Sequence, residues 1–95
     1  ETLLPASLQL FHNQSVSLGK LIKTMTLNPA LLLGLPSGRI SPGAPADLII
    51  FDADIPFILD RENLRSKSKN TPFDGHKLQG KVRRTIVAGK TIFEC

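Results

Sequence analysis

The stretch of residues 28–51 constrains this chain most, because helix-type sequence gives way there to strand-type sequence. Asn28-Pro29 and the leucines after it predict a short helix, with Pro29 in its first turn and Gly34 at a left-handed C-terminal cap. The prolines and glycines that follow exclude regular structure for about ten residues. Residues 48–51 are then a continuous apolar run of strand length. The main boundary therefore falls at this linker, between residues 1–35 and residues 36–95.

Two further helices are expected before the linker. Apolar residues recur in residues 3–11 as a helical stripe. Ser17 is a good N-terminal cap, and the apolar residues after it recur at helical spacing, which predicts a helix over residues 17–25. The next helix begins near residue 28 and ends near residue 33. These helices carry too many leucines to stand alone, so we expect them to pack against another part of a protein.

Strands dominate after the linker. Residues 78–93 are typical of a hairpin with Ala88-Gly89 at its turn, and the adjacent Arg83-Arg84 predicts a bulge in it. The polar residues 66–72 predict a loop. The remaining expectations are a turn at residues 52–54, a second short strand at residues 57–59 and one helical turn at residues 60–64. The fold class is therefore α+β, helices first and strands second.

Composition limits the class of protein. A chain of 95 residues allows one small domain with a thin margin of stability. Its single cysteine, Cys95, excludes an internal disulfide framework. No apolar run approaches the length of a membrane span, and the N-terminus lacks the pattern of a signal peptide. Because the sequence begins at Glu1 without a methionine, we expect it to be a piece of a longer protein.

The net charge of +4 raises nucleic-acid binding as a possibility. The basic residues, however, are spread along the chain, with small clusters at residues 65–69 and 81–84. Phe73 is the one aromatic residue near them that could stack on a base. A solvated loop and an exposed strand face are the better interpretation, so no nucleic-acid partner is expected.

No complete active site emerges from the residues alone. Residues 75–82 match a phosphate-binding loop up to Lys81, but Val82 replaces the required hydroxyl and a strand-type stretch follows. His12 and His76 lie on different elements without a spaced partner, and Asp52 with Asp54 is a usual turn pair. None of the serines, including the Ser66-Lys67-Ser68-Lys69 run, has the setting of a nucleophile. We therefore assign no catalytic, cofactor-binding or metal-binding residue.

A family resemblance covers essentially the whole chain. Several short segments resemble the C-terminal signature of the metal-dependent amidohydrolase superfamily: residues 28–30, Gly34-Leu35, residues 38–40, Gly43 and residues 46–52. Within it, the run from Ser66 to Gly75, together with residues 78–90, is similar to the dihydroorotase family of the long bacterial type. The opening residues 1–5 resemble that family's segment after the substrate-binding loop. His76 departs from the aromatic residue common at its position.

The resemblance implies a fold, a reaction and a cofactor. Residues 1–35 would be the last helices of a (β/α)8 barrel, and residues 36–95 would be part of a β-sandwich built jointly by both chain ends. The full-length parent would interconvert N-carbamoyl-aspartate and dihydroorotate in pyrimidine synthesis, using zinc to polarise the amide carbonyl and activate water. All of the family's metal ligands lie before Glu1, so this fragment is expected to be structural, catalytically inactive and free of zinc.

Alternatives remain open at this point. The parent could instead be a related cyclic amidase, such as a dihydropyrimidinase, hydantoinase or allantoinase, although the Asn70-Thr71-Pro72-Phe73 run argues against it. It could also be a metal-less scaffold for aspartate transcarbamoylase, or the chain could be a stand-alone basic binding module. The expected partners are the remainder of the barrel and either a second copy or aspartate transcarbamoylase, without a membrane. The expected location is the cytoplasm.

Overall fold

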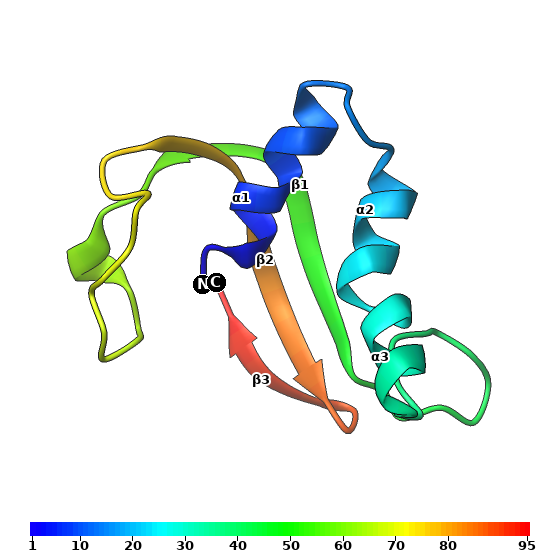
Figure 1. The fold of residues 1–95 in the computed structure, drawn as a ribbon. Helices are drawn as coiled ribbons and strands as arrows, with labels where there is room; N and C mark the ends of the chain where they lie inside the picture. The colour runs from blue at the N-terminus through cyan, green and yellow to red at the C-terminus, as the bar shows by residue number, and fades with distance from the viewer.

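The computed structural model describes residues 1–95, and three helices precede a three-stranded sheet in it (Figure 1). Helices α1 (Leu3–His12), α2 (Leu18–Met25) and α3 (Leu27–Leu33) come first. Strand β1 (Leu48–Ile58), a short 3-10 turn (Arg61–Asn63), strand β2 (Lys77–Val87) and strand β3 (Lys90–Glu94) follow. The α+β class and the order predicted from the sequence are confirmed. No helix combines the length and apolarity that a membrane crossing requires.

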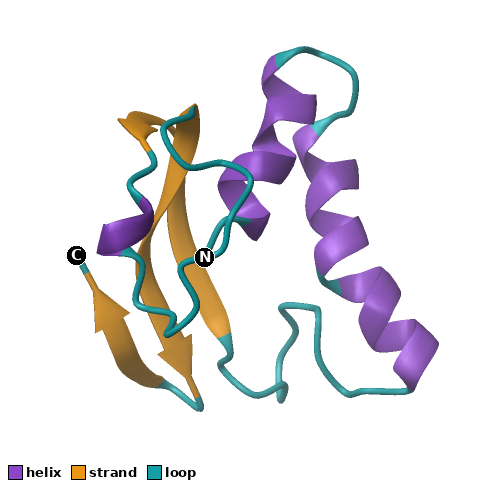
Figure 2. Ribbon diagram, turned by 60° about the vertical axis from the view of Figure 1, so that its left-hand side comes forward, coloured by secondary structure: helices purple, strands orange, loops and turns teal.

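The helix ends follow from local chemistry. The Ser17 Oγ accepts a hydrogen bond from the Lys20 N–H at 3.3 Å, which satisfies one of the free donors at the start of α2. Gly34 has φ +67°, the left-handed geometry that ends α3. In Figure 2, α2 and α3 lie almost end to end, and the irregular linker leads from α3 back to β1. The cap, the glycine and the linker were all predicted from the sequence.

The sheet is antiparallel throughout, in the order β1-β2-β3. Val87 pairs with Lys90, and Ala88 and Gly89 between them both have positive φ, as a tight hairpin turn requires. Opposite β1, Ile50 pairs with Arg84 and Phe51 with Val82, so Arg83 is an extra residue in β2. This irregularity is the bulge predicted from the two adjacent arginines.

The prediction of a turn at residues 52–54 is wrong. Asp52 pairs with Lys81 and Pro56 with Gln79, so β1 continues as one strand with a second bulge opposite Gly80. Inside this bulge the Asp52 carboxylate accepts the Asp54 N–H at 2.9 Å, and Gln79 Nε2 donates to the Asp54 carbonyl oxygen at 3.4 Å. The expected separate strand at residues 57–59 is therefore mostly the end of β1.

The core lies where α1 crosses the face of β2 (Figure 1). Leu8 of α1 is completely buried, and Leu78 of β2 is almost so. Gly80 makes this close approach possible, because a Cβ atom at that position would lie 2.3 Å from Leu8 Cδ1. Only 7 of the 95 residues are buried, so this core is small for the length of the chain.

Candidate functional site

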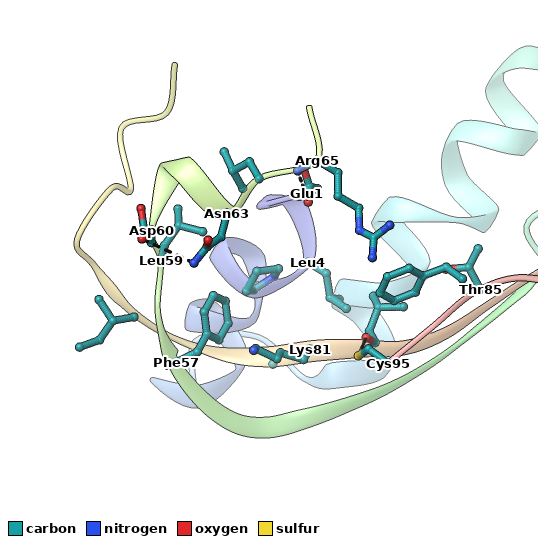
Figure 3. A pocket seen from close by; sticks show the side chains of 16 residues that line it. Glu1, Leu4, Phe57, Leu59, Asp60, Asn63, Arg65, Lys81, Thr85 and Cys95 are labelled. Atoms are coloured by element: carbon teal, nitrogen blue, oxygen red, sulfur yellow. Dashed lines mark hydrogen bonds between the residues drawn. The ribbon is translucent and has the colours of Figure 1, made fainter. Parts of the chain in front are cut away.

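A cavity of about 500 Å³ lies between the start of α1, the segment that follows β1, and strands β2 and β3. Its apolar lining includes Leu4, Pro5, Phe57 and Phe93. Its charged lining comes from separate parts of the chain, as Figure 3 shows with Glu1 beside Arg65 and Lys81 near Phe57. Polar and charged side chains from distant parts of the chain meet on its lining.

The carboxylate of Glu1 is held by backbone groups of a distant loop. Its Oε2 accepts the Arg65 N–H at 2.8 Å and the Ser66 N–H at 3.0 Å, and its Oε1 lies 3.1 Å from the same Arg65 nitrogen. The hydrogen bond from Arg65, followed by that from Ser66, lowers the pKa of the Glu1 carboxyl below its ordinary value. The group is therefore an ionised anchor at neutral pH.

The two cations of the cavity lie over aromatic rings. The Arg65 guanidinium carbon lies 4.8 Å from the centre of the Phe93 ring, and Lys81 Nζ lies 5.0 Å from that of Phe57. Both distances are typical of cation–π contacts. Asp60 is engaged as well, because it accepts the Glu62 N–H at 3.0 Å as the cap of the 3-10 turn. The charged groups thus hold neighbouring segments together, and no acid–base pair faces the cavity.

The structure keeps the two histidines apart. His12 Nε2 lies 2.8 Å from the Ala53 carbonyl oxygen, so this nitrogen carries its proton and donates. His76 packs edge-on against Phe73. Cys95 is exposed, and its Sγ lies 3.4 Å from the Val82 carbonyl oxygen. No group of three or more His, Cys, Asp or Glu residues could hold a metal ion, and this donor set does not fit a zinc site.

The remaining sequence motifs have structural explanations. Residues 75–82 run into β2 rather than into a helix, so the match to a phosphate-binding loop lacks its required setting. The Asp47 carboxylate accepts the Ala88 N–H at 2.8 Å, and thereby ties the hairpin turn to the start of β1. Lys69 Nζ donates to the Leu64 carbonyl within its own loop. Ser68 Oγ accepts the Asn70 N–H at 3.3 Å, and neither His12 nor Lys69 makes a hydrogen bond to a serine of that loop.

Sequence reasoning missed the role of Glu1. A glutamate just before a helix is usually interpreted as a stabilising partner of the helix dipole. The actual partners of Glu1 lie 64 and 65 residues away in the sequence. No spacing rule reports such a distant contact.

Comparison with known proteins places this fold and this set of residues in a family. Residues 3–92 match the amidohydrolase family, and the chain belongs to it. The dihydroorotase of Anaplasma phagocytophilum is 48% identical over 93 residues, and that of Ehrlichia canis is 50% identical over 93 residues. Each match covers 98% of this chain and 21% of the relative, so the chain spans about a fifth of the length of these proteins.

A solved structure agrees with the fold. The L-hydantoinase (dihydropyrimidinase) from Arthrobacter aurescens superposes with a TM-score of 0.86 and 36% sequence identity. The superposition covers 96% of this chain and 21% of the hydantoinase. The resemblance to dihydroorotases predicted from the sequence is confirmed.

Proposed function

We propose that this chain is part of a dihydroorotase, the enzyme that interconverts N-carbamoyl-aspartate and dihydroorotate. The observation that carries the proposal is the 48–50% identity to dihydroorotases over almost the whole chain. The solved hydantoinase, the representative of the rival cyclic amidases, is 36% identical over a similar length. The chain offers no candidate catalytic group of its own and spans about a fifth of these relatives, so the proposal concerns the parent enzyme.

Within that enzyme we assign this chain a structural role. A zinc ion in the parent would polarise the amide carbonyl and activate water, and its ligands would lie outside these residues, because the donor set here does not fit the metal. The Leu8–Gly80 contact and the Glu1 hydrogen bonds would hold the helices and the sheet of this chain in fixed positions relative to each other.

We further propose that residues 1–35 are the last helices of a (β/α)8 barrel and that residues 36–95 are part of its accompanying β-sandwich. Exposed apolar side chains support a missing partner on the helix side: Leu31, Leu32, Leu33 and Leu35 are all exposed. On the sheet side, the outer edge of β1 has no hydrogen-bonded neighbour, and unpaired edges of this length are normally covered. The remainder of the parent's own barrel is the proposed partner.

A chimera tests the proposed function. In one chimera, this chain replaces the matching segment of the Anaplasma phagocytophilum dihydroorotase. In a second chimera, it replaces the matching segment of the Arthrobacter aurescens L-hydantoinase. We expect the dihydroorotase chimera to keep measurable cyclisation of N-carbamoyl-aspartate, because the two segments are 48% identical over 93 residues. We expect the hydantoinase chimera to lose most of its activity on hydantoins.

The control is the same dihydroorotase chimera with Gly80→Leu, which should be inactive because the larger side chain occupies the position of Leu8. An active hydantoinase chimera beside an inactive dihydroorotase chimera would favour the related cyclic amidase instead.

A further inference from the structure

We infer that Glu1 is a positioning residue that fastens the loop of residues 64–72, called the clasped loop below, to the start of α1. The inference goes beyond the dihydroorotase proposal and does not depend on it. It rests on the hydrogen bonds of the clasped loop, on its aromatic contact and on the absence of other anchors along it.

The geometry at Glu1 is that of an anion held by consecutive backbone donors. The N–H groups of Arg65 and Ser66 point at the same carboxylate oxygen, Oε2, at 2.8 and 3.0 Å. Neither N–H has a backbone acceptor, so the carboxylate is their partner. Adjacent N–H groups that converge on one oxygen form a concave anion site, and here the anion is supplied by the chain itself.

The clasped loop has few other attachments. Its remaining hydrogen bonds are local: the Leu64 N–H donates to the Arg61 carbonyl, Lys69 to the Leu64 carbonyl, the Asn70 N–H to Ser68 Oγ, and the Phe73 N–H to Thr71 Oγ1. The Arg65 side chain adds one contact outside the loop, over the Phe93 ring at 4.8 Å. Apart from the contacts with the neighbouring residues 64 and 73, the only hydrogen bonds between residues 65–72 and the rest of the chain are therefore those to Glu1.

Trypsin cleavage sites within the clasped loop make it possible to measure this contact. Trypsin cleaves after Arg65, Lys67 and Lys69, and the first of these bonds is the Arg65–Ser66 peptide whose N–H donates to Glu1. A protease needs the segment to open locally before it can bind the chain. The rate of cleavage after Arg65 thus measures how often the Glu1 hydrogen bonds are broken.

The experiment compares trypsin cleavage and amide hydrogen exchange in the 95-residue chain and in Glu1→Ala, Glu1→Gln and Glu62→Gln variants. In Glu1→Ala we expect cleavage after Arg65 to rise about three- to tenfold, the effect of losing one or two exposed charge-assisted hydrogen bonds. In Glu1→Gln we expect a smaller rise, because the amide oxygen still accepts without a charge. Exchange of the Arg65 and Ser66 amides should accelerate in the same order.

Glu62→Gln is the matched control. It removes a nearby exposed carboxylate whose side chain faces Arg61 rather than the Arg65 or Ser66 N–H. Cleavage after Arg65 should stay at the level of the unmodified chain. Cleavage after Lys20 and Lys23, in α2, reports on the rest of the fold.

Two outcomes would overturn the inference. The first is unchanged cleavage and unchanged exchange at Arg65 and Ser66 in Glu1→Ala. The second is an equal rise in the rates of trypsin cleavage after Arg65 and after Lys20 in Glu1→Gln. Such a result would mean that this nearly isosteric change loosens the whole chain and has no specific effect on the clasped loop.

Discussion

Gly80 sets the distance between helix and sheet at the scale of a single residue. Its φ of +110° lies outside the range that side-chain-bearing residues favour, and its missing Cβ leaves room for the fully buried Leu8. Leucine and glycine are thus complementary in shape across the contact between α1 and β2.

We expect Gly80→Ala to lower the free energy of unfolding by about 1–3 kcal/mol, because the new methyl group both overlaps Leu8 and strains the backbone. Urea denaturation measures the change. Gly19→Ala is the matched control: nothing lies within 4 Å of its Cβ position, and alanine favours the helix by about 1 kcal/mol. Equal effects of the two substitutions would contradict this account of the core.

Glu1 gives the clasped loop a pH dependence. The Arg65 and Ser66 N–H groups lower the pKa of its carboxyl; the Arg65 guanidinium acts in the same direction, and partial burial opposes them. Asp60, Lys81 and Cys95 line the same cavity. A lowered pKa in the folded state means that these hydrogen bonds stabilise the loop above the ordinary value of 4.5 and are lost as pH falls through the lowered value.

We therefore expect the protection factors of the Arg65 and Ser66 amides to be constant from pH 7 to about pH 5 and to fall as the solution is acidified further. Hydrogen exchange, corrected for intrinsic rates, measures them. In Glu1→Gln the profile should be flat over that range. Protection that rises on acidification would show that the carboxylate is not the acceptor.

At the scale of the elements, the ends of α2 and α3 are decided locally. Ser17 caps α2, and Ser15 nearby makes no side-chain hydrogen bond. We expect Ser17→Ala to cost about 1 kcal/mol of stability through the loss of the cap, measured by thermal or urea unfolding. Ser15→Ala should change stability by less than about 0.5 kcal/mol, as surface substitutions usually do. A larger loss at Ser15 would contradict the assignment of the cap.

The same distinction explains which parts of the fold the sequence predicts. Helix ends, the linker and the Ala88-Gly89 turn depend on residues next to one another, so Ser17, Gly34 and the prolines identify them. The continuity of β1 through residues 52–54 was not predicted, because Asp52 and Asp54 look like a turn and only pairing with β2 keeps them in the strand. The cavity and the Glu1 contact join segments far apart in sequence, and no local pattern reports them.

At the scale of the whole molecule, the chain leaves much apolar surface exposed. Its radius of gyration is 14.4 Å, whereas a compact domain of this length has about 12 Å. Leu32 is 84% exposed and Ile40 is 88% exposed, and the leucines next to Leu32 are exposed as well. Exposed leucines of this kind support the proposal that another part of the parent protein covers them.

We expect the isolated chain to self-associate as its concentration rises, because these leucines and the open edge of β1 lack a partner. Sedimentation velocity over a range of concentrations measures this. Leu32→Glu should weaken the association, whereas Lys20→Glu, an exposed change on α2, should leave it nearly unchanged. A chain that stays monomeric at high concentration would contradict the expectation.

The central proposal is that these 95 residues build structure while the chemistry belongs to the rest of a dihydroorotase. The most direct measurement is the zinc content of the purified chain, of verified mass near 10.4 kDa, together with its turnover of N-carbamoyl-aspartate. The account predicts no stoichiometric zinc and no turnover above background, because the His, Cys, Asp and Glu residues form no metal-binding group. One zinc ion per chain with measurable turnover would contradict it.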